Sequence, residues 1–158
     1  LEDALSVREA NLSMMRRLCA SEEDLLVVQG NLANTYQKLG RLEEALYMRR
    51  DVYFGCLKLN GSPLSEVHED TLRIRNMILA ANNYAYALVV TVRRFEEAKA
   101  LMRKMMPVAR RVLGNENMLT LQSKMIYAEA RARRRASSVH GVVRRPVDHY
   151  VDRKFRNA

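Results

Sequence analysis

The chain has 158 residues, 48% of them hydrophobic, and carries 27 lysines and arginines against 18 aspartates and glutamates. This length fits one compact domain or a short array of repeats, and six glycines and three prolines are few for a fold rich in β-turns. No apolar stretch approaches the ~20 residues that a membrane-spanning helix needs, so we expect no transmembrane segment.

Apolar residues recur at helical spacing along most of the chain. The pattern predicts six helices, at about residues 1–19, 22–39, 41–59, 68–92, 94–113 and 117–135. Ser21, followed by Asp24 three residues later, predicts a capped start for the second helix. Gly40 predicts a helix end, because the residue after a helix often takes a positive φ that glycine adopts at low cost. Asn117 predicts the cap of the last helix.

Residues 31–59 are predicted to form a helical hairpin. Ala33 and Ala45 are small where two helices joined by a short turn must approach closely, and larger side chains there would overpack by ~1–3 kcal/mol. Similar segments at residues 1–5 and 95–98 indicate a repeat of about 42 residues, which is typical of a stacked helical array. The middle copy is expanded near residues 62–67 and 74–79, and the chain begins partway through a repeat, so we expect a fragment of a longer array.

Three stretches resemble tetratricopeptide repeats: Asn82-Asn83-Tyr84-Ala85, the Phe95-Glu96-Glu97-Ala98 segment within residues 93–114, and Leu113-Gly114 followed by Thr120-Leu121. The spacing of about 42 residues and the Leu-Gly-x-x-x-x-x-Thr-Leu linker are similar to the kinesin light chain type of repeat. The amino-acid sequence of these stretches also resembles the many such proteins of unicellular algae. The resemblance implies an all-α fold, an α-α superhelix or solenoid of about three helical hairpins with an incomplete first repeat, over residues 1–134. It also implies a non-enzymatic scaffold without cofactors.

The resemblance further implies a concave groove, lined by the first helix of each hairpin, that binds a peptide or a partner protein. Carried over by position, its candidate residues are Asn31, Asn34, Gln37, Lys38, Asn82, Asn83, Tyr86, Met125 and Glu129. The residues themselves support this, because Asn34 and Asn82 fall outside the apolar stripes and an amide offers a peptide both a donor and an acceptor. Tyr86 is the expected apolar anchor. The alternative is that these asparagines are solvated or cap helices.

The end of the chain, residues 135–158, is predicted to be a flexible basic tail. Residues 131–158 hold nine lysines and arginines and two aspartates, and the arginines that could bind nucleic acid or an anionic membrane are Arg131, Arg133, Arg134, Arg135, Arg144 and Arg145. No aromatic residues are interleaved with them as base stacking would require, so peptide binding in the groove remains the favoured function.

Other groups of polar residues do not predict catalysis or metal binding. The Glu43-Glu44 and Glu96-Glu97 pairs open helices, where negative charge suits the helix dipole. Cys19 and Cys56 lie on apolar faces without the spacing of a zinc or redox motif, which predicts buried, reduced thiols and a cytoplasmic setting.

Arg8 and Arg49 occupy the same repeat position on otherwise apolar faces. Their long side chains predict ion pairs with carboxylates between hairpins, or alternatively a reach into the groove.

Overall fold

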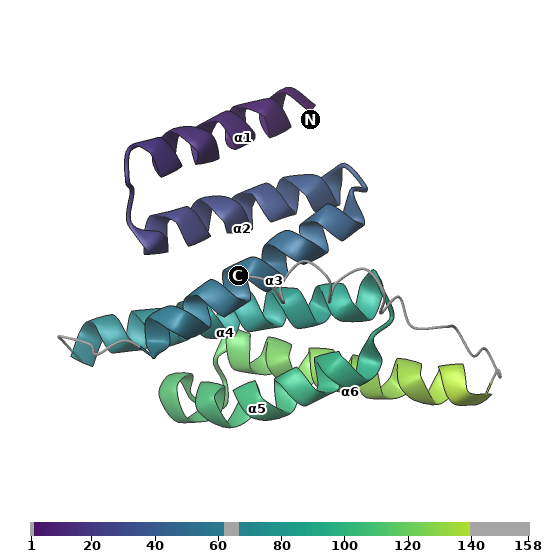
Figure 1. Cartoon of the computed structure of the whole chain (residues 1–158). Helices are drawn as coiled ribbons and strands as arrows, with labels where there is room; N and C mark the ends of the chain where they lie inside the picture. Colours follow the sequence, from purple (N-terminus) through teal and green to yellow (C-terminus); the bar gives the residue numbers. More distant parts are fainter. Residues whose placement is uncertain (1, 62–66, 140–158) are drawn as a thin grey trace, which may run out of the picture.

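A computed structural model describes residues 2–61 and 67–139 of the chain as a stack of six helices (Figure 1). The helices are α1 (Glu2–Arg17), α2 (Glu22–Lys38), α3 (Leu42–Asn60), α4 (Val67–Val90), α5 (Phe95–Leu113) and α6 (Met118–Val139). From the top of the view downward come α1, α2, α3 and α4, with α5 and α6 together at the bottom, and the described residues contain no strand. The predicted all-α repeat fold is therefore confirmed, with two complete hairpins, α2–α3 and α4–α5, between the single helices α1 and α6.

The helix ends follow the predicted local signals. The backbone N–H of Asp24 donates to Ser21 Oγ at 3.1 Å, and the Ser21 hydroxyl donates to the Asp24 carboxylate at 2.6 Å. Gly40 leaves α2 with a φ of 75°, a left-handed conformation that suits glycine. Asn117 caps α6 by accepting the N–H of Leu119 at 3.0 Å.

Two predicted boundaries differ from the structure. Helix α6 continues to Val139, beyond the expected end near residue 135, because alanine and arginine are good helix formers and Arg133 pairs with Glu129 one turn earlier at 2.7 Å. The extra residues at 74–79 lie inside α4, which has 24 residues against 17 in α2. The chain absorbs this insertion as added helix, and most of the predicted insertion at 62–67 lies outside the described residues.

Helix packing depends on small residues where the helices approach closely. Ala33 is 0% exposed and Ala45 is 2% exposed, as the hairpin between α2 and α3 requires. The main core joins α3, α4, α5 and α6, with Leu26 of α2, around the fully buried Ile78, Leu88 and Met102. A smaller cluster joins α1 to α2 and the start of α3. No helix in the described part of the chain is long and apolar enough to cross a membrane.

Candidate functional site

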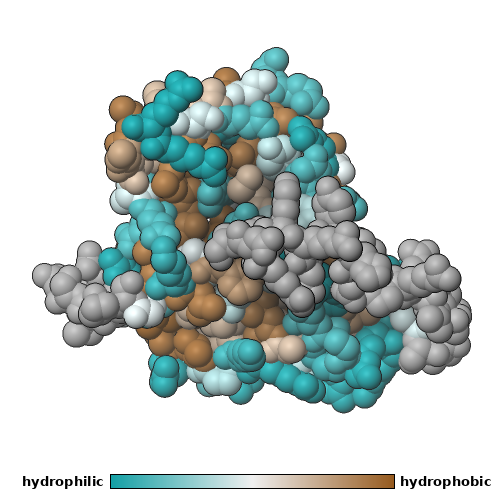
Figure 2. Space-filling model, in the orientation of Figure 1, coloured by the Kyte–Doolittle hydropathy of each residue, from teal (hydrophilic) through white to brown (hydrophobic). Residues whose placement is uncertain are grey.

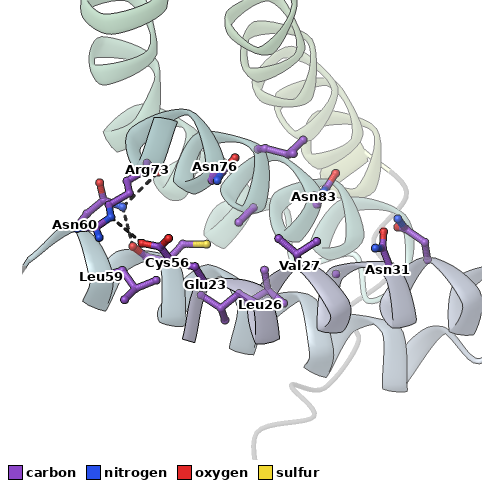
Figure 3. A pocket seen from close by; sticks show the side chains of 15 residues that line it. Glu23, Leu26, Val27, Asn31, Cys56, Leu59, Asn60, Arg73, Asn76 and Asn83 are labelled. Atoms are coloured by element: carbon purple, nitrogen blue, oxygen red, sulfur yellow. Dashed lines mark hydrogen bonds and ion pairs between the residues drawn. The ribbon is translucent and has the colours of Figure 1, made fainter. Parts of the chain in front are cut away.

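A groove of about 210 Å³ lies between α2 and α4, with α3 contributing to its floor (Figure 3). Helices α2 and α4 are the first helices of their hairpins and run in the same direction (Figure 1). The groove is lined by Glu23, Leu26, Val27, Gly30, Asn31, Asn34, Val52, Cys56, Leu59, Asn60, Arg73, Asn76, Leu79, Ala80 and Asn83. Apolar side chains thus form a floor, and asparagines from both helices stand along it.

Helical periodicity places these side chains on the walls. In α2 the lining residues recur every three or four positions from Glu23 to Asn34, and in α4 they do so from Arg73 to Asn83. Because α2 and α4 are parallel, Asn31 and Asn34 of one wall lie across the groove from asparagines of the other, and Figure 3 shows Asn31 and Asn83 on opposite walls.

An ion pair closes one end of the groove. Arg73 Nε lies 2.7 Å from Glu23 Oε1 and joins the start of α4 to the start of α2. The side-chain amide of Asn60 donates to the carbonyl of Cys56 at 2.7 Å and to that of Arg73 at 3.4 Å, which links the end of α3 to α4 (Figure 3). At this end the cationic and anionic side chains neutralise each other.

A buried cation, Arg49, contacts the groove residue Asn34 but does not itself line the groove. The side chain of Arg49, from α3, is only 8% exposed, and its Nη2 donates to Asn34 Oδ1 at 3.1 Å and to Gln37 Oε1. Within the described residues Nε has no hydrogen-bond partner and no carboxylate lies within ion-pair distance. Burial lowers the pKa of Arg49, the neighbouring Tyr86 of α4 raises it, and a guanidinium still keeps its charge at neutral pH.

Within the described residues neither Arg8 nor Arg49 forms the predicted pair with a carboxylate. Arg8 Nη1 donates instead to the backbone carbonyl of Asn31 at 2.8 Å, which fastens α1 to α2. Arg49 contacts Asn34, which lines the groove, but Arg49 itself is not among the lining residues. It carries a charge there that the two neutral amides of Asn34 and Gln37 solvate only in part.

The structure brings part of the predicted groove set together. Asn31, Asn34 and Asn83 line the groove, Gln37 contacts Arg49, and Tyr86 is 44% exposed beside Arg49. The other six predicted residues do not line it: Gln37, Lys38, Asn82, Tyr86, Met125 and Glu129. Of these, Lys38, Met125 and Glu129 are exposed away from it, and Glu129 pairs with Arg133 on α6.

The prediction that Asn82 lines the groove is wrong, because the structure buries this side chain away from the groove. It is 2% exposed, its Nδ2 donates to the Leu119 carbonyl at 2.9 Å, and its Oδ1 accepts the Ser123 hydroxyl at 2.7 Å. One residue along a helix turns a side chain by about 100°, so Asn83 faces the groove while Asn82 faces α6. Asn82 therefore holds α4 to α6 and is not available to a ligand.

The groove also contains residues that the sequence analysis did not select. Glu23, Asn60, Arg73 and Asn76 complete the walls and the closed end. Asn76 precedes Asn83 by two helical turns, which is a periodic signal that could have identified it. The ion pair between Glu23 and Arg73 joins residues fifty positions apart, and no local pattern indicates it.

The two cysteines differ, although both were predicted to be buried. Cys56 is buried and lines the groove, and burial and the nearby Glu23 raise the pKa of its thiol. Cys19 is exposed, so that prediction is wrong: its φ of 51° places it in the turn after α1, beyond the apolar face.

A thiol-reactive probe is expected to distinguish these cysteines. Cys19 should react at least about tenfold faster than Cys56, because a buried thiol with a raised pKa supplies little thiolate. Time-resolved mass spectrometry after addition of a maleimide measures both rates, with a Cys19→Ser variant as the control that isolates Cys56. Equal rates in the folded chain would contradict the burial of Cys56.

The predicted basic residues separate into three groups. Arg131, Arg134 and Arg135 line a second hollow between α5 and α6, together with Lys99, Arg103 and Tyr127. Arg133 pairs with Glu129 and does not line it, and Arg144 and Arg145 lie outside the described residues. Among the described residues no cluster of histidine, cysteine, aspartate and glutamate side chains could hold a metal ion.

Comparison with known families agrees with the helical hairpins. The family model for the tetratricopeptide repeat matches residues 25–53 and 78–117, which cover most of α2 with the first part of α3, and the second half of α4 with α5. No curated protein and no solved structure matched the chain. The two matched segments are similar to tetratricopeptide repeats, and the described helices form an all-α helical repeat array.

Proposed function

We propose that this chain is a non-enzymatic interaction scaffold whose groove between α2 and α4 binds an extended peptide segment of a partner protein. The tetratricopeptide type of fold supports binding to proteins, and the apolar floor with asparagines on both walls suits a peptide backbone with one apolar side chain. The repeat spacing of about 42 residues favours the kinesin light chain type of array. Two free thiols favour a reducing, cytoplasmic setting.

Arg49 is the observation that carries the proposal. A buried guanidinium that meets only two amides and no described carboxylate can gain a charge-assisted hydrogen bond from an anionic group of a ligand. The opposite end of the groove offers no such cation, because Arg73 is paired with Glu23. We therefore infer that the bound segment carries a carboxylate near Arg49 and Tyr86, which would also set its direction along the groove.

The affinity should be modest. Each amide hydrogen bond contributes ~0.5–1.5 kcal/mol, one buried apolar side chain ~1.5–3 kcal/mol, and one bond to a charged group ~1.5–3 kcal/mol. Ordering the peptide and losing its free motion offset much of this gain. Dissociation constants in roughly the micromolar range or weaker are therefore expected.

Filling the groove from Gly30 tests the proposal. A Cβ atom placed on Gly30 meets no atom within 4 Å, and Gly30 lines the groove within α2. Gly30→Leu should therefore place its side chain in the groove and weaken peptide binding at least about tenfold, while its higher helix propensity stabilises α2 by ~0.5–1 kcal/mol. Calorimetric titration with peptides selected from a random displayed library measures the loss.

Gly30→Ala is the matched control, because it gives a similar gain in helix propensity but adds a single methyl group at the wall. It should bind the selected peptides nearly as well as the unchanged chain. Selected peptides that bind Gly30→Leu with undiminished affinity would place the binding surface elsewhere.

A further inference from the structure

Five cationic side chains meet in a hollow of about 460 Å³ between α5 and α6, which we call the basic cleft. Lys99 and Arg103 come from α5, and Arg131, Arg134 and Arg135 come from α6, with Tyr127 beside them. Hydrophilic side chains gather over this part of the molecule, where the first half of α5 meets the second half of α6 (Figure 2, lower right). The basic cleft lies away from the peptide groove and shares no lining residue with it.

The packing of two helices creates this arrangement. Lys99 and Arg103 are one turn apart on α5, and Tyr127, Arg131 and Arg134 follow one another at helical spacing on α6. Neither segment alone is unusual, since charged stripes usually face water. Packing α6 against α5 turns the two stripes toward the same hollow.

Few carboxylates in the described part of the chain pair with the cations of the cleft. Glu96 lies 2.9 Å from Lys99 Nζ and 2.6 Å from Arg134 Nε, so one carboxylate neutralises part of two cations. Lys99 is only 6% exposed, which is unusual for a lysine and holds its charge at the base of the cleft. Lys99, Arg103, Arg131 and Arg134 thus bring four positive charges to the described part of the cleft, and Glu96 is the carboxylate paired with two of them.

The positive charges of the cleft affect the hydroxyl of Tyr127. Its pKa is lowered by a hydrogen bond from Arg103 and by the charges of Arg103, Arg131 and Lys99. The Arg103 guanidinium lies over the Tyr127 ring, 5.9 Å from its centroid. Like charges held together in this way repel one another, and a bound anion would relieve that repulsion.

We propose that the basic cleft binds a compact ligand that carries two or more phosphate groups. Arginine presents a planar fork of donors that matches phosphate oxygens, and four of the five cations are arginines. The volume is within the range of small-ligand sites, ~300–1,000 Å³. Several phosphates suit the number of cations better than a single phosphate, which carries about two charges.

A nucleic acid fits the cleft less well. Single-stranded nucleic acid needs exposed aromatic faces for its bases, whereas Arg103 covers the one tyrosine of the cleft. A flat membrane surface would reach the exposed arginines of α6 more readily than the buried Lys99. The proposal does not depend on peptide binding in the groove.

The test compares two arginines of α6 that differ in position but not in charge. Arg131 lines the basic cleft, whereas Arg133, two residues later, pairs with Glu129 and does not line it, and both are exposed. Tripolyphosphate, titrated into the intact chain at physiological ionic strength, should bind the unchanged protein. Arg131→Gln should weaken this binding about tenfold, and Arg133→Gln should change it less than about twofold.

Further titrations distinguish the source of the phosphates and the competing ligand class. Vesicles that carry a phosphoinositide, competed by tripolyphosphate and weakened by Arg131→Gln, would support the cleft with a lipid headgroup as ligand. Equal losses in Arg131→Gln and Arg133→Gln would overturn the proposal, because they would indicate diffuse charge attraction. Absence of tripolyphosphate binding, or tighter binding of a single-stranded RNA oligonucleotide that both variants weaken equally, would overturn it as well.

Discussion

Replacing Arg49 by methionine is expected to weaken the binding of an acidic peptide by about tenfold to a hundredfold, because a charge-assisted hydrogen bond contributes ~1.5–3 kcal/mol. The same change should leave the free energy of unfolding unchanged or raise it. Arg49 is 8% exposed and pairs with no described carboxylate, so the folded state bears the cost of desolvating its charge. Binding should therefore weaken without a loss of stability.

The measurement combines calorimetric titration with urea unfolding followed by circular dichroism. A peptide whose acidic group is replaced by an amide serves as the control in a double-mutant cycle. Arg49→Met should barely change the affinity of that neutral peptide. If the acidic and the neutral peptide lost affinity equally, Arg49 would only shape the groove and the proposed carboxylate contact would be wrong.

Replacing Asn82 by alanine is expected to lower the free energy of unfolding by ~2–4 kcal/mol, because a buried amide with partners at both ends is lost. The change removes the acceptor of the Ser123 hydroxyl, at 2.7 Å, and one donor to the Leu119 carbonyl, at 2.9 Å. The Ser123 hydroxyl also lies 3.0 Å from the Leu119 carbonyl, so part of the loss can be recovered there. The contact between α4 and α6 should weaken most.

Asn83→Ala is the natural control, because it removes the same amide from the neighbouring, exposed position. Its effect on unfolding by urea should stay within ~0.5 kcal/mol, as is usual for surface changes. Ser123→Ala should not add fully to Asn82→Ala, since the two side chains share one hydrogen bond. Equal stabilities of the Asn82→Ala and Asn83→Ala variants would contradict the structural role of Asn82.

The two ends of the groove differ in charge. One end is neutral because Glu23 and Arg73 pair at 2.7 Å, whereas Asn34, farther along α2, contacts the buried charge of Arg49. Arg73 lies in α4 directly before the predicted insertion at 74–79 and before the segment that matches the repeat family from residue 78.

The sequence alone determined where the helices lie and what kind of array they form. Ser21, Gly40 and Asn117 mark helix ends through hydrogen bonds and backbone angles that involve only neighbouring residues, and apolar spacing marks the buried faces. Such signals are local, so they survive without knowledge of the rest of the chain.

Only the tertiary structure decided which polar side chains meet and which are buried. Asn82 and Asn83 are identical in type and adjacent in sequence, yet one ties α4 to α6 and the other faces the groove. The environment of Arg49, the ion pair between Glu23 and Arg73, and the basic cleft all depend on how helices distant in sequence pack together. Their energies arise from contacts across the stack, and helical spacing within one segment does not encode them.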